Sequence, residues 1–381
     1  MHRQAVDTPP VALFLPDHRI LLVHSLDDGT LNLHGTGQDA RVEGSIAESL
    51  MALAQGSHNT TDQQRLAVLE GRHAWLRGLS QARTTPPQGL GHTLLRAGLG
   101  MLFVEVTARC NERCIHCYAD SGPERSKFLS LDEIKSTLDQ ARELGRAFVQ
   151  FTGGDPLIHP QLVEAVAHAA NLDFAGIEIY TNGLLLSDSL LDSLATCRPR
   201  LSFSVYADRA DIHDAITRLP GSWRRTLDAM RRAMQAGFEV RAGIVLMPEN
   251  ISRAEHMTAF LKRELGLDNE HIRFDPVRQA GRGRFMREAE QILVAPDAHN
   301  SSKPAKGKIC ISADAQVYPC IFARHNRLGN IREQSLAGIL ASLDNRPAAP
   351  PSQRRWQRCR QQLSCGDCQM IAYIMGDATD D

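Results

Sequence analysis

Residues 102–120 read LFVEVTARCNERCIHCYAD, and this stretch joins a strand-like segment to a cluster of cysteines. The segment LFVEVT is rich in the β-branched and aromatic residues that strands prefer. Cys110 is the third residue after it, and Cys114 and Cys117 complete the spacing C-x3-C-x2-C. Active sites of (β/α) barrels lie on the loops that leave the C-terminal ends of the strands. The stretch therefore predicts a metal centre on such a loop.

Further strand-like runs follow this one, and segments with helical periodicity separate them. They lie at 147–152, 176–181, 201–206, 238–246 and 271–275. A capping box at Ser130-Leu-Asp-Glu133 marks the start of one helix, and Gly145 and Gly237 mark helix ends. Repeated strand-helix units imply a parallel sheet. Six such strands predict an α/β fold with a partial (β/α)6 TIM-like barrel, and a doubly wound sheet is the alternative.

The composition is that of a globular protein. The chain has 381 residues, of which 43% are hydrophobic and 23% charged, and this length suits two or three domains. A formal net charge of −1 gives no general attraction to nucleic acid or anionic lipid. The sequence has no apolar run of about eighteen residues and no secretory signal. We therefore expect a cytoplasmic protein that binds neither nucleic acid nor membranes.

The nine cysteines are unevenly spread along the chain. Three form the cluster described above, Cys197 stands alone, and five lie near the C-terminus. An odd number of cysteines in a reducing compartment argues against a disulfide framework. We interpret the two groups as two separate metal centres and Cys197 as a small core residue.

Composition and pattern divide the chain into three parts. Residues 1–90 predict a small α+β module in which short strands precede two helices. A polar run with two prolines at 80–91 predicts a linker. The barrel repeats occupy residues 98–295. Residues 296–381 are rich in Pro, Gly, Ser and Cys, so we expect a metal centre to stabilise them.

The residue types alone leave two chemistries open at the first cysteine cluster. A structural zinc site needs four ligands, and the nearest candidates for a fourth are Glu112, His116 and Asp120. Three thiolates on one loop instead suit three irons of a [4Fe–4S] cluster, whose fourth iron stays open for another ligand.

The segment Cys110-Asn-Glu-Arg-Cys114-Ile-His-Cys117-Tyr118 resembles the signature loop of the radical S-adenosylmethionine (SAM) superfamily. Other motifs of that family follow in order over residues 102 to about 290, each after a strand-like run. The resemblance implies that Cys110, Cys114 and Cys117 hold a [4Fe–4S] cluster whose open iron binds SAM.

The later motifs imply a set of SAM-binding residues. Thr152-Gly-Gly-Asp-Pro156 resembles the GGE-P motif of the family, and Thr181-Asn-Gly183 resembles its TNG turn. Ser204, together with the later Arg218, resembles the S-x-D-G…H-D-x-x-R pattern. A guanidinium can bind the SAM carboxylate through two parallel hydrogen bonds. The resemblance therefore implies SAM contacts at Gly153, Gly154, Asp155, Ser204 and Arg218.

The chain departs from the family pattern at two places. Asp155 stands where the family has Glu, with the same charge and one methylene fewer. Tyr206-Ala207 replaces an Asp-Gly pair, so no acidic SAM ligand is expected there. We interpret His213 as a helix cap or a core histidine without a catalytic role.

The C-terminal cysteines resemble the SPASM/twitch extension of radical SAM enzymes, which holds auxiliary iron–sulfur clusters. Cys310-x9-Cys320 is followed by Leu328-Gly-Asn-Ile and then by a C-x2-C pair, although Ala315 replaces the usual glycine. Five cysteines cannot supply the seven ligands of a full SPASM domain. The resemblance implies one auxiliary [4Fe–4S] cluster, with a zinc ribbon as the alternative. The ligands of the cluster would be Cys310, Cys320, Cys365 and Cys368. Cys359 would be spare, a substitute ligand or a substrate contact.

The resemblance implies an enzyme that cleaves SAM reductively and uses the resulting 5′-deoxyadenosyl radical on a substrate. The expected substrate is a ribosomally synthesised precursor peptide, which would be cross-linked, epimerised, decarboxylated or excised. The expected electron donor is a flavodoxin or ferredoxin. Residues 11–79 resemble the winged-helix recognition modules of peptide maturases, which bind a leader peptide as an added strand. The alternatives are maturation of a cofactor or small molecule, and a zinc-stapled peptide-binding protein without catalysis.

Overall fold

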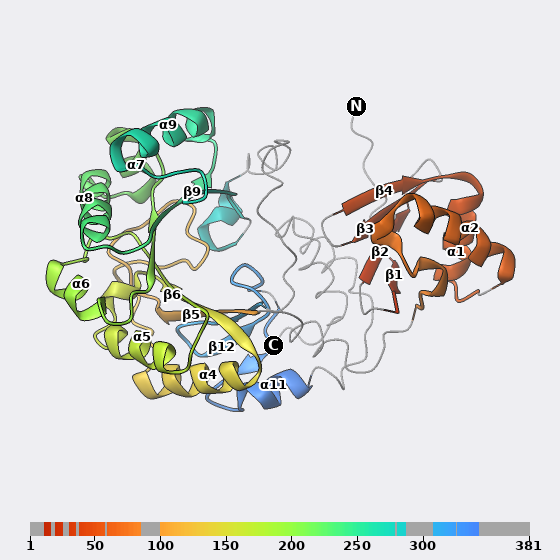
Figure 1. Ribbon diagram of the computed structural model, residues 1–381, viewed down its shortest axis with the longest axis horizontal. Coiled ribbons are helices and arrows are strands. Elements are labelled where there is room, and N and C mark those ends of the chain that lie inside the picture. Colours follow the sequence, from red (N-terminus) through yellow and green to blue (C-terminus); the bar gives the residue numbers. More distant parts are fainter. Residues whose placement is uncertain are drawn as a thin grey trace. The chain divides into compact units, whose positions relative to one another are not determined.

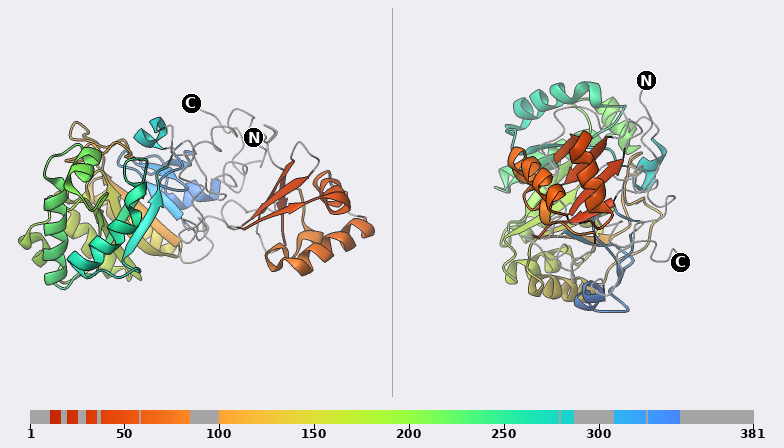
Figure 2. Two further views of the ribbon diagram at one scale, coloured as in Figure 1. Left: turned by 90° about the horizontal axis from the view of Figure 1, so that it is seen from above. Right: turned by 90° about the vertical axis from the view of Figure 1, so that its right-hand side faces the viewer.

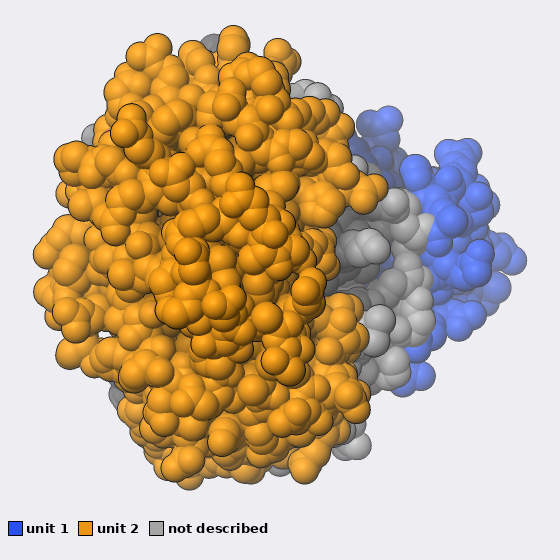
Figure 3. Space-filling model, turned by 60° about the vertical axis from the view of Figure 1, so that its left-hand side comes forward, with its two compact units in different colours: residues 1–97, 302–306, 340–381 blue, residues 98–301, 307–339 orange. Residues whose placement is uncertain are grey.

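The computed structural model describes residues 11–16, 20–25, 30–35, 38–57, 59–84, 100–278, 280–286, 308–324 and 326–342. The chain forms two compact units (Figure 3). One consists of residues 1–97, 302–306 and 340–381, and the other of residues 98–301 and 307–339.

The first unit contains a four-stranded antiparallel sheet with two helices on one face (Figures 1 and 2). Its strands pair in chain order and are β1 (Val11–Phe14), β2 (Ile20–Ser25), β3 (Leu31–Gly35) and β4 (Gln38–Val42). The helices are α1 (Gly44–Ala54) and α2 (Thr60–Arg72). The sequence predicts the strand-then-helix order but not β4, because the segment QDARV lacks a continuous apolar pattern.

Aliphatic side chains from the sheet and from both helices form the core of this unit. Leu13, Leu21 and Leu33 come from the strands, Leu50 and Leu66 come from the helices, and each is at most 2% exposed. Burying one such side chain contributes about 1.5–3 kcal/mol. The unit is therefore stabilised mainly by apolar burial.

The predicted linker begins later than expected. The Glu70 carboxylate accepts hydrogen bonds from the N–H groups of Gly78 and Ser80 at 2.9 and 2.6 Å. Arg83 forms an antiparallel backbone bridge with Phe14 of β1. Residues 80–84 thus belong to the first unit, and the rest of the predicted linker lies outside the described residues.

The second unit is built on six parallel strands that pair in chain order, with helices on the outer face of the sheet (Figure 1). The strands are β5 (Gly100–Thr107), β6 (Arg146–Gly153), β7 (Gly176–Thr181), β8 (Arg200–Ser204), β9 (Val240–Leu246) and β10 (Ile272–Pro276). The helices are α4 (Leu131–Glu143), α5 (Leu162–Asn171), α6 (Asp188–Leu194), α7 (Ala210–Thr217), α8 (Ser222–Gln235) and α9 (Ala254–Leu265). Within the described residues β10 does not pair with β5, so the predicted partial barrel is confirmed.

The predicted helix ends are confirmed as well. The Ser130 hydroxyl accepts the Glu133 N–H at 3.2 Å, and the Glu133 carboxylate accepts the Ser130 N–H at 2.7 Å. Gly145 and Gly237 have φ angles of +78° and +80°, the left-handed conformation in which glycine ends a helix without steric cost.

The segment after the barrel extends the same sheet. Strand β11 (Lys308–Ile311) pairs in parallel with the free edge of β5, and β12 (Gln316–Tyr318) and β13 (Gly329–Asn330) continue from it. Helix α11 (Leu336–Ser342) follows. The sequence places a domain boundary at residue 296, but the described strands beyond it share a sheet with the barrel.

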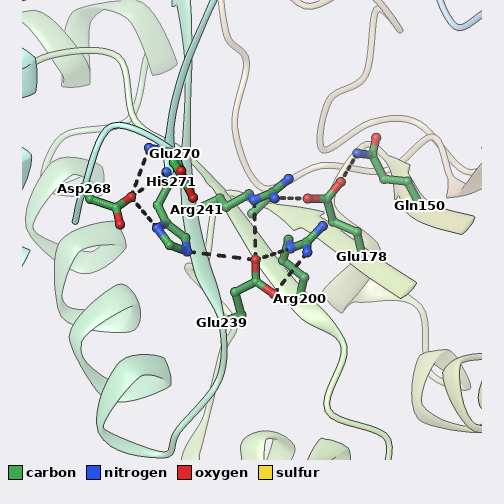
Figure 4. A network of polar contacts seen from close by, with 9 residues as sticks. Gln150, Glu178, Arg200, Glu239, Arg241, Asp268, Glu270 and His271 are labelled. Atoms are coloured by element: carbon green, nitrogen blue, oxygen red, sulfur yellow. Dashed lines mark hydrogen bonds and ion pairs between the residues drawn. The ribbon is translucent and has the colours of Figure 1, made fainter. Parts of the chain in front are cut away.

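Polar side chains also connect neighbouring barrel strands (Figure 4). Glu178 on β7 accepts hydrogen bonds from Gln150 on β6 and Ser202 on β8. Glu239, which precedes β9, accepts two hydrogen bonds from Arg200 at 2.6 and 3.0 Å. Arg200 begins β8 and Glu239 directly precedes β9, so both lie at the end of the strands opposite the cysteine loop. This end of a barrel usually serves stability.

Candidate cofactor site

The cysteine loop leaves the C-terminal end of β5 and is held by backbone hydrogen bonds from two other elements. The Ile115 N–H donates to the Ile216 carbonyl in α7 at 3.0 Å. Arg282 belongs to η5 (Gly281–Phe285), which follows β10, and its N–H donates to the Cys117 carbonyl at 2.9 Å. Segments distant in sequence therefore determine the shape of the loop.

The Arg282 side chain is an anchor of this loop that sequence reasoning missed. Its Nε donates to the Cys114 carbonyl and its Nη1 to the Ser121 carbonyl, both at 2.8 Å. A Cβ on the neighbouring Gly281 would lie 2.3 Å from the Cys117 carbonyl oxygen, so glycine is needed for this approach. The segment PVRQAGRG at 276–283 can be read in the sequence, but the sequence does not show that Arg282 contacts the cysteine loop.

The three thiols have surroundings that suit an iron–sulfur cluster. The Glu112 N–H donates to the Cys110 sulfur at 3.5 Å, and the Ser121 N–H donates to the Cys117 sulfur at 3.4 Å. Hydrogen bonds to sulfur are one of the features that tune such clusters. Burial raises the pKa of the Cys110 and Cys114 thiols, so a bound metal is what would deprotonate them.

The geometry does not resemble a mononuclear zinc site. In the part of the chain that the structure describes, no three His, Cys, Asp or Glu side chains converge as on one metal ion. Asp120 forms ion pairs with arginines, and His116 packs edge-on against Tyr206 with ring centroids 4.6 Å apart. Glu112 contacts the Cys114 thiol at 3.4 Å. A [4Fe–4S] cluster takes each thiolate on a separate iron and needs no fourth side-chain ligand from this loop.

Gly153 and Gly154 bring the loop after β6 against the backbone that leads into the cysteine loop. A Cβ on Gly153 would lie 2.3 Å from the Thr107 carbonyl oxygen, and a Cβ on Gly154 would lie 2.0 Å from that of Arg109. The Gly154 N–H donates to the Thr107 carbonyl at 2.7 Å. The resemblance implies a close approach of SAM at these glycines, and the structure adds a close approach of two protein backbones.

Asp155 connects the loops after β6 and β7. Its carboxylate accepts hydrogen bonds from the Leu157 N–H at 2.9 Å, the Thr181 hydroxyl at 2.7 Å and the Asn182 N–H at 3.0 Å. Burial raises the pKa of Asp155, and these three donors act in the opposite direction. The carboxylate therefore ties the two loops together.

Asn182 extends this network to the cysteine loop. Its Nδ2 donates to the Asn111 side-chain oxygen at 2.6 Å and lies 3.9 Å from the Cys110 sulfur. Its carbonyl accepts the Thr226 hydroxyl of α8 at 2.8 Å. The motif Thr-Asn-Gly was the sequence signal, and its contact with the cysteine loop became visible only in the structure.

Ser204 ends β8, and its side chain lies near the phenols of Tyr180 and Tyr206. Burial raises the pKa of both phenols, so they stay protonated at neutral pH. A Cβ on Gly243 would lie 1.8 Å from the Tyr180 hydroxyl, so this glycine makes room for the tyrosine. The Ser204 hydroxyl thus lies in the neighbourhood of two buried, protonated phenols.

Arg218 ends α7 with a φ of +57°, which is uncommon for a residue other than glycine. The preceding Thr217 accepts the N–H of Arg113 from the cysteine loop at 3.1 Å, so Arg218 lies next to that loop. Its side chain is exposed, and it makes no ion pair or hydrogen bond within the described residues. Strained backbone of this kind is often found at functional sites.

His213 has the structural role expected of it. It is 1% exposed, and its Nδ1 accepts the Tyr206 N–H at 3.2 Å. Burial lowers the pKa of His213 to about 4, so it is neutral at physiological pH. Cys197 is only half-buried, so its interpretation as a core residue is wrong.

Two of the four cysteines expected to hold the auxiliary cluster are described. Cys310 lies on β11 and Cys320 follows β12, and both are buried. Ala315 in the turn between them has a φ of +69°, which explains why glycine is usual there. Cys365 and Cys368, like Cys359, lie outside the described residues, so the full ligand set stays a prediction.

Two family models match the chain. Residues 104–261 match the radical SAM superfamily, and residues 305–369 match SPASM, an iron–sulfur cluster-binding domain. The first match contains the cysteine loop and the loops after β6, β7 and β8. The second spans the C-terminal cysteines from Cys310 to Cys368.

Curated relatives share part of the chain. AlbA, the antilisterial bacteriocin subtilosin biosynthesis protein of Bacillus subtilis, is 26% identical over 266 residues, which cover 62% of this chain and 58% of AlbA. The AdoMet-dependent heme synthase of Methanosarcina barkeri is 30% identical over 174 residues, which cover 45% of this chain and 49% of that protein. The chain thus spans about half the length of the curated relatives it matches.

Among solved structures, the fold resembles that of Streptococcus suis SuiB bound to precursor peptide SuiA. The TM-score is 0.55 at 14% identity, and the match covers 95% of this chain and 94% of SuiB. The similarity shows a shared fold. With both family models matched and the cysteine loop at the C-terminal end of β5, the chain carries a radical SAM domain over residues 104–261 and a SPASM iron–sulfur cluster-binding domain over residues 305–369.

Proposed function

We propose that this chain is a radical SAM enzyme that modifies a ribosomally synthesised precursor peptide. The observation that supports the proposal is the cysteine loop at the end of β5. It presents three thiols, and hydrogen bonds to α7, η5 and Asn182 hold the loop in place. A [4Fe–4S] cluster and SAM, when bound, supply the one-electron cleavage of SAM to methionine and a 5′-deoxyadenosyl radical, with the electron coming from a flavodoxin or ferredoxin.

The chain's own residues would bind and orient these groups. Cys110, Cys114 and Cys117 are the ligands for three irons. Arg218 offers two parallel N–H donors to the SAM carboxylate, and the Ser204 hydroxyl offers a third donor. The carbonyls of the Gly153-Gly154-Asp155 loop accept hydrogen bonds from the SAM amino group.

The peptide substrate is supported by the relatives and by the first unit. AlbA acts in subtilosin biosynthesis, and SuiB was crystallised with its precursor peptide. Strand β4 is an edge of the four-stranded sheet, and no described strand pairs with its outer side. Such an edge presents free N–H and C=O groups to which a peptide can add as a further strand. We assign leader-peptide capture to β4.

Maturation of a cofactor or small molecule is the second candidate. The heme synthase of Methanosarcina barkeri favours it, because by its name this relative makes a cofactor and not a peptide product. Its aligned region covers 45% of this chain, which is about the extent of the barrel. The zinc-stapled, non-catalytic alternative loses its support, since both family models describe radical SAM or iron–sulfur domains.

The proposed location is the cytoplasm, where a reducing environment preserves thiols and clusters. Within the described residues, no helix combines the length and apolar character needed to cross a membrane.

The test combines the anaerobically reconstituted protein with SAM, dithionite and the precursor encoded by a neighbouring reading frame. We expect about eight irons per chain, as two clusters of four, and 5′-deoxyadenosine formed together with a mass change in the peptide. Twelve irons in three cubanes would refute the single auxiliary cluster. If adding the precursor changes neither the peptide mass nor the yield of 5′-deoxyadenosine, the peptide substrate is wrong.

A further inference from the structure

An ion pair between a buried carboxylate and a partly buried guanidinium connects the two cysteine-bearing parts of the second unit. Glu105 on β5 accepts a hydrogen bond from Arg324, and their side chains are 5% and 25% exposed. Glu105 precedes Cys110 by five residues, and Arg324 follows Cys320 by four. The pair therefore joins the strand before the first cysteine loop to the loop after the auxiliary cysteine.

Two tyrosine rings contact the Arg324 guanidinium. It lies 5.6 Å from the ring centroid of Tyr118 and 5.1 Å from that of Tyr318. The Arg324 Nε also donates to the Ile321 carbonyl at 2.9 Å. Tyr118 directly follows Cys117, and Tyr318 comes two residues before the second auxiliary cysteine. Both rings thus belong to the cysteine-bearing segments themselves, and the cation contacts each of them.

The charges of this pair lie near Cys310. In the pairing of β11 with β12, Cys310 lies opposite Tyr318, whose ring the Arg324 guanidinium contacts. In the pairing of β11 with β5, Cys310 lies opposite Phe103, two residues before Glu105. Buried charges are screened less than exposed ones, so their effect on a neighbouring group is larger. A cluster ligated by Cys310 would experience the same two opposed charges.

We propose that Arg324 is a positioning residue for the auxiliary cluster, the cluster that Cys310 ligates. The positive charge of the Arg324 guanidinium raises the reduction potential of this cluster. The inference rests on the proposed function, since it requires Cys310 to be a cluster ligand. Reduction adds one electron from the external donor to the cluster, and no bond forms or breaks in the protein. A fixed cation nearby stabilises the added negative charge, whereas Glu105 opposes it.

The test is an EPR-monitored redox titration of the reconstituted full-length enzyme. Arg324→Gln should lower the midpoint potential of the auxiliary cluster, and Glu105→Gln should raise it. Arg324→Lys keeps the charge and should restore most of the wild-type potential. A tenfold change in the reduction equilibrium corresponds to about 59 mV for one electron, which such a titration resolves.

Arg332→Gln is the matched control. Arg332 belongs to the same segment and pairs with Glu133 at 2.6 Å, but its side chain is 48% exposed. Removing this screened charge should leave both potentials unchanged. The proposal is overturned if Arg324→Gln lowers the auxiliary potential no more than Arg332→Gln does.

Two further measurements distinguish an error in the proposed ligation by Cys310 from an error in the proposed role of Arg324. Cys310→Ala should lose the EPR signal of the auxiliary cluster, and its retention would mean that the proposed ligation, rather than the role of Arg324, is wrong. If Arg324→Gln does not retain iron, Glu105→Gln decides, because an unchanged or lowered potential in that variant overturns the proposal.

Discussion

The two units of this chain bury different kinds of interior. The first has a core of aliphatic side chains from its sheet and helices. The second also buries polar and charged groups beside its cysteines, such as Glu105, Asp155, Asn182 and His213. Buried polar groups are costly unless they are hydrogen-bonded, so they are kept where a position has to be fixed. The aliphatic core of the first unit therefore stabilises its fold, whereas the buried polar groups of the second unit also fix the positions of side chains near the cysteines.

The largest effect should come from replacing Cys110, Cys114 and Cys117 together by Ala. All thiols of the first loop are lost, so formation of 5′-deoxyadenosine under dithionite should be abolished. Iron bound to the auxiliary cysteines should remain, at about half of the wild-type content. Product formation by the triple variant would show that the first loop is not the site of SAM cleavage.

Deleting residues 1–90 removes the four-stranded sheet and the two helices of the first unit. Residues 91–381 keep every cysteine of the chain, so SAM cleavage without peptide should continue, while the affinity for a leader peptide should fall at least tenfold, about 1.4 kcal/mol. Fluorescence anisotropy with a labelled leader measures the affinity, and the iron content of the truncated chain checks its folding. An unchanged Kd would exclude leader capture by the first unit and favour a small-molecule substrate.

Two glycine substitutions compare how tightly the units are packed. A Cβ on Gly154 would collide with the Arg109 carbonyl, so Gly154→Ala should lower the free energy of unfolding by about 1–3 kcal/mol and reduce the iron retained. Gly71 in α2 has nothing within 4 Å of such a Cβ, so Gly71→Ala should raise it by up to about 1 kcal/mol. Urea unfolding measures both, and changes of the same sign would contradict the comparison.

The smallest effect concerns the pH dependence of stability in the cluster-free protein. Burial raises the pKa of Glu112 from 4.5 to about 7, so the folded state retains a proton that the unfolded chain releases. Stability should therefore decrease as pH rises from about 4.5 to about 7, and Glu112→Gln should remove this decrease. Urea unfolding near pH 5 and near pH 8 measures it, with Glu124→Gln at a half-exposed carboxylate as the control. A slope in Glu112→Gln equal to that of the wild type would refute the assignment.

Local patterns were enough to predict much of this protein. The six strand runs, the Ser130–Glu133 capping box and the helix-ending glycines depend on residues a few positions apart, and the structure confirms them. The spacing of Cys110, Cys114 and Cys117, followed by motifs at successive strand ends, was enough to indicate the family. Signals of this kind are readable because their interacting residues are neighbours in the chain.

Tertiary structure decided the features whose partners are distant in sequence. Three such features are the pairing of β11 with the edge of β5, the anchoring of the cysteine loop by Arg282, and the Glu105–Arg324 pair. In each of them, the sequence of one segment does not indicate which other segment it contacts. Edge strand β4 was missed for a related reason, because strand pairing rather than apolar periodicity defines it. The sequence by itself therefore determined the elements and the ligand types, whereas long-range packing decided which side chains hold the ligands in position.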